Sequence, residues 1–596
     1  MWLLFLDMSA ERAAPPLTST AHAIAQLAGV TVSAVHAHVR RGTLEKPAWQ
    51  VGKTSLWSTD QIERFLAARR GPGRPRTASP TSSLERVRVT QRDFGAYYTP
   101  TEVAEYLTRW AMALEPRDVL EPSFGEGAFL AAGRTQGSEA TWLGYELDAQ
   151  AVSTAVSNDL IGQNEAINGD FLGCPNPLVD AAVGNPPFVR VRHLPAPEAR
   201  SARAAYREAV GEDFDPSGSV WAPFVAKCTG SLRPTGALAF VLPWEMTYVR
   251  YARALWRYLG ASFSSIRTLR IKERLFPKLS QDVILFMASG KGGSTEAIDF
   301  ETYESFVDVE RERPATRATI SLSAVVAGER EFQRCLIPQE IRESVLLTLR
   351  EHSQPISALA KFHIGYVSGH KSFFHPSHEQ IERFSLPTSS LINAIIDARG
   401  MKGVGLRTSD IPSHDQLWMP IEPTAADEAY RREGMARKVH EAYKCKIRDP
   451  WHIVPGVKSP DVIVSVFADT PLLMINDSGA AASNSLICGY LRPNQRADVL
   501  AAHWYSAIAR LSMELEVHSL GGGVLVLIPG EADRLLVPKS ILTSGLDSVD
   551  QLVRDGQLAA AYHSADTQLR MMIGSEGLGQ LWEAIEALEG WRKRTT

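Results

Sequence analysis

The stretch VGNPPFVR, residues 183–190, closes a run of apolar residues with an amide, two prolines and an aromatic ring. Asn185 offers a side-chain oxygen and Pro186 a backbone carbonyl, and these two acceptors can bind the two hydrogens of one amino group. Proline fixes the backbone and removes N–H donors, so the segment that includes Pro187 is stiff and rich in acceptors. Phe188 adds a face for a planar ring. This pattern suits an amine on a delocalised ring, whose nitrogen becomes more nucleophilic as the oxygens draw off its hydrogens.

Three carboxylates follow three earlier apolar runs, each where a strand is expected to end. Glu121 lies in VLEPSFGEGAFL, Glu146 in GYELD, and Asp170 precedes Phe171 in NGDFL. Because the carboxyl ends of parallel strands meet at one edge of a sheet, we expect these acids to line one crevice. Glu121 would face a cation and Glu146, about 20 residues beyond the glycines, would bind ribose hydroxyls. Asp170 would accept from an adenine amine, with Phe171 beside the ring.

The loop after the first of these runs carries two glycines. Gly125 and Gly127 follow Glu121 and Pro122 and allow a tight turn and a close approach of the backbone to a ligand. The loop has GxG but not GxGxxG, which disfavours pyrophosphate. A ligand with a cation, a ribose and an adenine, but without a need for a phosphate cradle, is S-adenosylmethionine rather than NAD. We therefore expect S-adenosylmethionine as the cofactor.

The order of these motifs resembles the gamma-class N6-adenine DNA methyltransferases, close in plan to the TaqI methylase and to Eco57I-type methylases. GAYYTPTEVAEYL, EPSFGEG, YELD, GDF, NPPF and RLFPKLSQDVILF follow one another, and the resemblance spans roughly residues 92–540. This chain departs from the commoner pattern with Glu121-Pro122 in place of Asp-Pro, and with Phe188 where many relatives have Tyr. Both changes keep the charge or the ring.

The resemblance implies roles for further residues. Tyr98, Thr99 and Pro100 would close over the methionine part of the cofactor, and Phe276 would sandwich a flipped-out base against Phe188. The implied reaction is a direct methyl transfer to N6 of an extruded adenine in double-stranded DNA. It also implies the modification part of a restriction-modification or related defence system. A separate restriction endonuclease or defence-complex subunit is then a candidate partner.

The elements that must position these residues follow from the hydrophobic pattern. In residues 92–330 seven short apolar runs alternate with helical segments, which predicts an α/β fold with a doubly wound, mostly parallel sheet. The runs are DVLEPS, TWLGYELD, AINGDFL, DAAVGNPPF, GALAFVLPW, SIRTLRIKE and DVILFMAS. The resemblance implies that this is the Rossmann-like sheet of class I methyltransferases. Residues 331–596 are mixed, and IGYVSGHKSFF and AASNSL within them resemble a target-recognition domain of mixed α+β structure. We expect its basic stripe to contact DNA phosphates through Arg431, Arg432, Lys438 and Arg448.

The amino-terminal part has a different character. Residues 1–70 resemble a helix-turn-helix module of the MerR or excisionase kind, in which His36, His38, Arg40 and Arg41 would lie on or just after a recognition helix. A small packing or dimerisation module is the alternative interpretation. Residues 71–91, rich in Pro, Gly, Ser and Arg, predict a flexible basic linker.

Composition narrows the class of protein. The chain has 596 residues, a net charge of -4 and five cysteines without CxxC spacing, so we expect several domains, a reducing compartment and no metal site. The opening MWLLFLD is too short for a signal peptide or a membrane span, which predicts a cytoplasmic protein without membrane contact, and either Met1 or Met8 is the start. The resemblance implies a bacterial, nucleoid-associated protein.

Three other functions fit parts of the pattern. The NPPF motif also occurs in methyltransferases that act on a protein glutamine amide or on guanine N2 of ribosomal RNA, because all of these substrates are planar amines. A fused nuclease is disfavoured because no Lys follows an Asp or Glu by two residues. A DNA-binding regulator with an inactive methylase fold is disfavoured by the intact set of Glu121, Glu146, Asp170 and Asn185.

Overall fold

The structure, a computed structural model, describes residues 99–137, 139–276, 281–520, 523–540 and 545–594, with a few stretches before them. Met1–Ser83 and Leu84–Thr596 form two separate compact units. In the first unit β1 (Thr18–Thr20), β3 (Thr54–Ser58) and β2 (Trp49–Val51) form an antiparallel sheet in the order β1-β3-β2. The predicted helices with His36, His38, Arg40 and Arg41 and the linker 71–91 lie outside the described residues, so the helix-turn-helix module stays a prediction.

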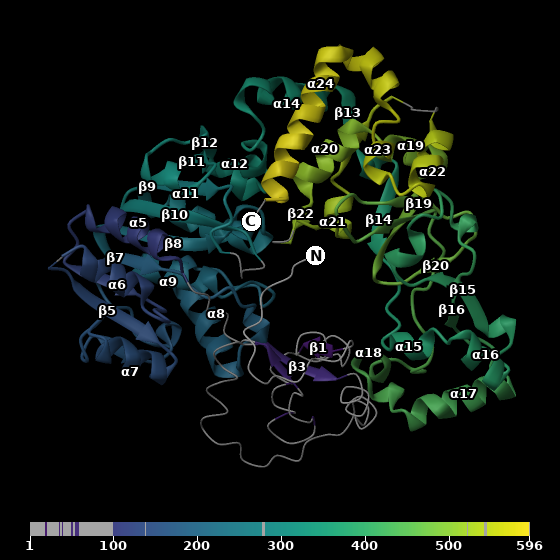
Figure 1. Ribbon diagram of the computed structural model, residues 1–596, viewed down its shortest axis with the longest axis horizontal. Coiled ribbons are helices and arrows are strands. Elements are labelled where there is room, and N and C mark those ends of the chain that lie inside the picture. Colours follow the sequence, from purple (N-terminus) through teal and green to yellow (C-terminus); the bar gives the residue numbers. More distant parts are fainter. Residues whose placement is uncertain are drawn as a thin grey trace, which may run out of the picture. The chain divides into compact units, whose positions relative to one another are not determined.

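A nine-stranded sheet dominates the second unit, in the order β12-β11-β9-β10-β8-β7-β4-β5-β6 (Figure 1). Neighbouring strands from β6 to β8 are parallel, whereas β10 runs antiparallel to both β8 and β9. All seven strands predicted from the sequence are present, so the predicted doubly wound α/β fold is confirmed, and β11 and β12 extend it. The strands are β4 (Asp118–Glu121), β5 (Thr141–Glu146), β6 (Ala166–Asn168), β7 (Val179–Gly184), β8 (Leu232–Pro243), β9 (Phe263–Ile271), β10 (Val283–Lys291), β11 (Ala297–Tyr303) and β12 (Thr316–Ser321).

The two faces of this sheet are covered separately because successive strand residues point to opposite sides. In β8, Ala239 and Val241 face a core that includes α5 (Thr101–Met112) and α6 (Ala128–Thr135). Leu238 and Phe240 face the other core. That core is built with α8 (Ala196–Val210), α9 (Trp221–Ser231), α10 (Arg253–Gly260) and α12 (Leu322–Ala327). Shorter or peripheral helices are α7 (Ala149–Ser157), α11 (Phe306–Glu310), η1 (Phe171–Gly173), η2 (Val191–His193), η3 (Trp244–Thr247) and η4 (Arg250–Ala252).

Beyond β12 the chain forms several small sheets rather than one large one. A four-stranded sheet has the order β14-β21-β17-β19, and a three-stranded one has the order β16-β15-β20. Two further sheets are the two-stranded β13-β24 and the three-stranded β18-β23-β22. Their bounds are β13 (Ser353–Pro355), β14 (Ala360–Ile364), β15 (Leu391–Ile395), β16 (Asp415–Trp418), β17 (Val462–Ser465), β18 (Phe467–Ala468), β19 (Leu473–Ile475), β20 (Ala481–Ala482), β21 (Leu486–Leu491), β22 (His518–Ser519), β23 (Leu525–Val526) and β24 (Leu536–Pro538).

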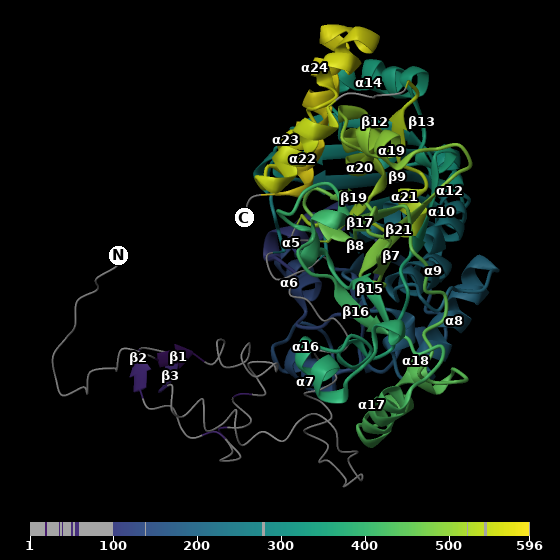
Figure 2. The ribbon, with the colours of Figure 1, turned by 90° about the vertical axis from the view of Figure 1, so that its right-hand side faces the viewer.

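Helices of this carboxy-terminal region pack in two ways. An aromatic cluster around Phe373 and Tyr430, whose rings stack at 4.6 Å, joins the short helices of one part. The longer helices α14, α20 and α24 lie side by side (Figures 1 and 2). The helices are α13 (Glu331–Arg334), α14 (Gln339–His352), α15 (Lys371–Phe374), α16 (His378–Phe384), α17 (Ala425–Ala436), α18 (Tyr443–Lys446), α19 (Ala497–Trp504), α20 (Ala507–Glu516), α21 (Pro529–Ala532), α22 (Leu546–Arg554), α23 (Leu558–Ala561) and α24 (Asp566–Arg592).

The core under the large sheet continues into this region. Val345 of α14, Leu511 of α20 and Leu588 of α24 belong to the same buried cluster as Phe286 of β10. The predicted boundary at residues 330/331 therefore falls where packing is continuous, and Leu84–Thr596 is one compact unit. Within the described ranges, no helix is both long and apolar enough to cross a bilayer.

A buried ion network joins α20 to the end of α24. Arg592, whose side chain is 4% exposed, donates to Glu514 at 2.7 and 2.9 Å and to Asp469 at 2.8 Å. Glu514 also pairs with Arg510 at 2.8 Å. Removing one member of such a network leaves a buried charge without its full set of partners.

We expect Arg592→Met to lower the free energy of unfolding by about 3 to 5 kcal/mol, because Glu514 then stays buried with one cation fewer. Urea unfolding followed by tryptophan fluorescence measures this. The neighbouring Lys593→Met removes only partly exposed ion pairs and should cost less than about 1 kcal/mol. Equal effects of the two substitutions would contradict this account, and adding Glu514→Gln to Arg592→Met should recover part of the loss.

Candidate active site

The residues singled out from the sequence converge at the carboxyl edge of the parallel strands. Glu121 ends β4, Glu146 ends β5 and Gly184 ends β7, directly before Asn185. The ends of β4 and β7 are close, because a Cβ added to Gly184 would lie 3.5 Å from Pro122 Cδ and 3.8 Å from Glu121 Cγ. The order β7-β4-β5 puts the first carboxylate between the other two groups.

Glu121 is a buried carboxylate with an unused oxygen. The residue is 1% exposed, and its Oε2 has no hydrogen-bond partner among the described residues. Burial raises the pKa of Glu121 well above its usual value, and the nearby Glu146 carboxylate adds to the shift. A buried acceptor without a partner is costly unless a ligand supplies a donor or a positive charge.

The glycine loop is tied to the end of β5. Glu146 accepts the N–H of Gly125 at 2.9 Å through Oε2 and the N–H of Asp148 at 2.9 Å through Oε1. Each oxygen keeps a second lone pair for a ligand hydroxyl. Gly125 has φ +54° and Gly127 φ +82°, and the space beside Gly125 is open where a Cβ would lie. The loop therefore adopts the left-handed turn that only glycine adopts readily.

Asp170 and Phe171 begin η1, next to the end of β6. Asp170 accepts the N–H of Leu172 at 3.0 Å, and its burial raises the pKa of the carboxyl. Phe171 is 1% exposed and packs against Tyr145 and Phe224, with ring centroids 5.2 and 5.7 Å away. The ring thus forms the floor of this region, and contact of Phe171 with a ligand stays a prediction.

Asn185 is held by a residue from the start of the unit. Its side-chain amide donates to the hydroxyl of Thr99 at 3.1 Å. Thr99 is 6% exposed and precedes Pro100, which caps α5. Because the NH₂ side of the amide is engaged, Oδ1 is the part of Asn185 that can accept from a substrate. Tyr98 lies outside the described residues.

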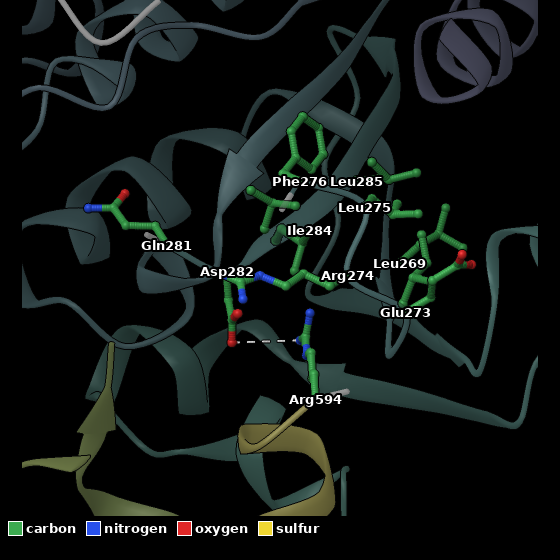
Figure 3. A pocket seen from close by; sticks show the side chains of 12 residues that line it. Leu269, Glu273, Arg274, Leu275, Phe276, Gln281, Asp282, Ile284, Leu285 and Arg594 are labelled. Atoms are coloured by element: carbon green, nitrogen blue, oxygen red, sulfur yellow. Dashed lines mark ion pairs between the residues drawn. The ribbon is translucent and has the colours of Figure 1, made fainter. Parts of the chain in front are cut away.

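Two aromatic rings were predicted to enclose a base. Phe188 is half-buried and packs against the cores on both faces of the sheet. Phe276 is 6% exposed, belongs to one of these cores and lines a pocket after β9 (Figure 3). Both rings thus lie on the core around α5, and the sandwich itself stays a prediction.

The exit of the NPPF segment is anchored by a charge network that the sequence pattern did not reveal. Arg190 donates to Glu245 of η3 at 2.9 Å, and the same carboxylate accepts from Trp221 at 3.2 Å and Tyr251 at 2.6 Å. Val220 N–H also donates to the carbonyl of Val189 at 2.8 Å. The only signal in the sequence is the basic residue that follows VGNPPFV.

The predicted basic stripe lies on α17, α18 and the turns after them. Arg431 pairs with Glu428 at 2.6 Å and Lys438 with Glu441 at 3.9 Å, whereas Arg432 is exposed and donates to a helix carbonyl. Arg448 donates to the carbonyls of Ser368 and Val367 and so holds that loop. DNA contact by these four residues stays a prediction.

This arrangement can bind a cationic nucleoside at Glu121 and Glu146 while Asn185 accepts from an amine beside it. Comparisons with known proteins find similarity to type II methyltransferases. Residues 329–570 match the family described as the C-terminal domain of the type II methyltransferase M.Eco57I. M.AccI of Acinetobacter calcoaceticus is 19% identical over 490 residues, which cover 77% of this chain and 87% of that protein.

Shorter matches point the same way. M.TthHB8I of Thermus thermophilus is 28% identical over 217 residues, 34% of this chain and 46% of that protein, and M.HincII of Haemophilus influenzae is 25% identical over 206 residues, 32% and 36%. The chain thus spans less than half the length of these two relatives. The predicted doubly wound α/β fold and the resemblance to Eco57I-type restriction-modification methylases are confirmed, and the chain is similar to type II methyltransferases.

Solved structures with a similar trace include two restriction enzymes. The type IIL restriction-modification enzyme MmeI, solved in complex with DNA, has a TM-score of 0.43 at 13% identity and covers 95% of this chain and 87% of its own. The type IIG restriction endonuclease BpuSI has a TM-score of 0.41 at 13% identity and covers 93% and 73%.

We expect Arg190→Met to lower the free energy of unfolding by about 2 to 3 kcal/mol, because Glu245 then remains buried and charged with neutral partners alone. The matched control is Arg192→Met, which changes an exposed arginine two residues away whose Nε donates to His193. Thermal unfolding measures both. A loss of stability in Arg192→Met as large as in Arg190→Met would show that the network does not anchor the segment.

Proposed function

We propose that the protein is a DNA methyltransferase that transfers a methyl group from S-adenosylmethionine to N6 of a flipped-out adenine, as the modification part of a restriction-modification system. The observation that carries this proposal is the orientation of Asn185. Its NH₂ group donates to Thr99, which leaves Oδ1 as an acceptor at the end of β7, beside the buried Glu121.

The residues present fit the cofactor. The unpartnered oxygen of Glu121 suits a cation, the lone pairs that remain on Glu146 suit ribose hydroxyls, and the open space at Gly125 allows close approach. When bound, S-adenosylmethionine supplies an electrophilic methyl group on a sulfonium. Pro122 begins the loop that contains Gly125. Thr99, which accepts from Asn185, and the neighbouring Pro100 lie on the side of Asn185.

In this mechanism the protein positions an amine and accepts hydrogen bonds from its two hydrogens. Asn185 Oδ1 and the carbonyl of Pro186 are the two acceptors, and they raise the electron density on N6. As the bond from N6 to the methyl carbon forms and the bond from that carbon to sulfur breaks, N6 releases one proton to solvent. Pro187 keeps the segment stiff and Phe188 stacks on the ring, with Phe276 on its other side. Catalysis then rests on orientation in a partly dry site, without a covalent intermediate.

The carboxy-terminal region supports DNA over the alternative substrates. It matches the C-terminal domain of a type II methyltransferase, and MmeI, a restriction-modification enzyme, was solved with DNA. The exposed Arg432 and Lys438 provide local positive charge on a chain whose net charge is -4. An RNA or protein amide methyltransferase would not require this region.

We expect Asn185→Ala to reduce methylation of adenine at least about a hundredfold, because the lost contact acts on the reacting nitrogen. Unmethylated plasmid DNA is the substrate, and N6-methyladenine is measured by mass spectrometry of nucleosides. Cofactor affinity and thermal midpoint should stay near wild type. Near-normal turnover in a folded Asn185→Ala protein would refute the mechanism.

Thr99 tests the orientation of the amide without removing it. Thr99→Val keeps the shape but removes the acceptor for the Asn185 NH₂, so we expect kcat to fall about tenfold, the cost of one misplaced hydrogen bond. Thr99→Ser should restore it. If Thr99→Val instead raised only the KM for S-adenosylmethionine, Thr99 would act on the cofactor and not on Asn185.

The raised pKa of Glu121 predicts a pH dependence of cofactor binding. A cation binds the ionised carboxylate, so affinity is full above the raised pKa and falls as the pH drops through and below it, by up to about tenfold per unit. Calorimetry between pH 7.5 and 5.5 measures this. Glu121→Gln should bind weakly with little pH dependence, and Glu126→Gln, an exposed change in the same loop, should follow wild type. An unchanged slope in Glu121→Gln would assign the dependence to another group.

A further inference from the structure

A cluster of four arginines lies where the large sheet meets the carboxy-terminal region. Arg250 belongs to η4, Arg253 begins α10, Arg330 precedes α13 and Arg534 lies just after α21. Burial lowers the pKa of Arg253, and the positive charges of Arg534, Arg250 and Arg330 lower it further. Among the described residues, the charges that act on Arg253 are therefore all of its own sign.

The Arg253 side chain has a defined place in the fold. Helix α10 packs against α12, which ends before Gly328 (Figure 2). Gly328 has φ +93°, and a Cβ added there would overlap the Arg253 guanidinium. The guanidinium thus lies directly over the Gly328 backbone, in a space that a larger residue would fill.

Two of the four arginines are already paired. Arg330 is 8% exposed and donates to Glu531 at 3.1 Å, and the exposed Arg534 donates to Glu516 at 3.1 Å. His518 shares Glu531 at 2.9 Å, and Arg330 Nε lies 3.8 Å from Glu516 Oε2. Both acids of this network are therefore already shared.

Arg250 and Arg253 have no such partner. Within the part of the chain that the structure describes, neither side chain makes a hydrogen bond or an ion pair, and Nε of Arg253 is buried. Asp215 is near enough to feel the charge of Arg250, but it forms no ion pair with it and accepts from Ser217 at 2.7 and 2.8 Å. The two guanidinium groups thus keep their donors for an anion.

The start of α10 also disfavours these two charges. The amino-terminal end of a helix carries a partial positive charge, so cations are unfavourable there. Arg253 is the first residue of α10, and the first turn holds no acidic residue. An anion bound here would relieve both the repulsion among the arginines and the repulsion from the helix end.

The two arginines lie beside the exit of the NPPF segment. Strand β8 pairs in parallel with β7 and leads through η3 into η4, so η4 follows the same sheet edge as Asn185. Tyr251, which lies between the two arginines in the chain, accepts from Arg190 at 3.4 Å. Arg250 is exposed and Arg253 is half-buried, so both can be reached from solvent.

We propose that Arg250 and Arg253 bind phosphates of the duplex DNA backbone beside the NPPF segment, and that Arg534 extends this contact onto the carboxy-terminal region. Backbone contacts hold a duplex in register without reading its sequence, which suits residues next to the place where a base would leave the helix. Exposed cations suit a polymer that carries a phosphate at every nucleotide and can reach several of them at once. This inference rests on the proposed function.

The test uses the full chain and a pool of random-sequence 40-bp duplexes. We expect Arg250→Gln/Arg253→Gln to bind the pool about tenfold more weakly than wild type at low salt. The slope of log affinity against log salt should become shallower by about two, because each lost phosphate contact removes about 0.9. Arg257→Gln is the matched control, since this exposed arginine one turn along α10 is paired with Glu212 at 2.7 Å, and it should leave both values unchanged. An unchanged affinity and slope in the double variant would overturn the proposal.

Thermal unfolding separates this role from a structural one. Because both arginines are unpaired and lie near other positive charges, the double variant should melt at or above the wild-type midpoint. If it melts lower, the single change Arg250→Gln decides, because it alters an exposed side chain. That variant should melt normally and make the salt slope shallower by about one, and an unchanged slope would overturn the proposal.

Inorganic phosphate distinguishes a duplex from a small phosphate ligand. Calorimetry should show no saturable binding of inorganic phosphate to wild type, because the linked phosphates of a polymer supply the affinity. Saturable phosphate binding that the double variant loses, while its duplex affinity stays at the wild-type value, would reassign the arginines to a small ligand and overturn the assignment to DNA.

These outcomes are independent of the outcome for the proposed function, because no assay here measures methylation. A salt slope that depends on Arg250 and Arg253 would support the DNA contact even if the chain methylated no adenine. Normal DNA binding by the double variant of an active methyltransferase would retain the proposed function and remove the contact.

Discussion

The candidate site depends on one constraint: a hydrogen-bond acceptor that is shielded from water needs a donor from the protein or from a ligand. The carboxyl edge of β4, β5 and β7 holds two carboxylates and an amide, of which Glu121 is buried and Glu146 and Asn185 are half-buried. Each buried acceptor must find a donor or carry a cost of several kcal/mol. Glu146 finds backbone N–H groups and Asn185 is fixed by Thr99, whereas Glu121 keeps one oxygen unpartnered. Among these three groups, Oε2 of Glu121 is therefore the buried acceptor that is left without a hydrogen bond, and a cation would bind there.

The stiffness of the NPPF segment has a structural cost that explains the network around Glu245. Two consecutive prolines cannot donate backbone hydrogen bonds, so the segment after β7 cannot be held by a strand ladder. Arg190, Ser219 and Val220 take over that task through side-chain and backbone contacts with η3 and the start of α9. An acceptor-rich loop is thus made rigid from its exit, and its own oxygens stay available.

Much of the sheet could be predicted because its signals are local. Apolar runs ended by Glu121, Glu146 and Asn185 are readable from spacing alone, and the seven predicted strands occur in a sheet order that brings these ends together. The pairing of Thr99 with Asn185 joins residues 86 apart in the chain, and nothing in either motif specifies it. β11 and β12 were missed because their sequences, AIDFETY and TRATIS, place polar or charged residues between the apolar ones and so lack the apolar runs of the central strands.

The same limit applies to the carboxy-terminal half. A boundary at residues 330/331 is where the regular alternation of strands and helices ends, yet burial does not respect it, because Leu511 and Leu588 pack in the core under β10. Composition cannot show such sharing, since a core is defined by contact and not by chain order. The basic stripe could be read as charge, but the partners of Arg431 and Arg448 could not.

The last turn of α24 shows how this sharing reaches the edge of the sheet. Arg592 bonds within the carboxy-terminal region to Asp469 and Glu514, and two residues later Arg594 reaches Asp282 before β10. The ring centroid of Trp591, the residue before Arg592, lies 5.4 Å from Cζ of Arg270 and 5.8 Å from Cζ of Arg594. One helical turn therefore fixes the carboxy-terminal region to the strand edge beside Phe276. The two arginines are two residues apart in the chain, so the same short stretch of backbone holds the carboxy-terminal region and the strand edge together.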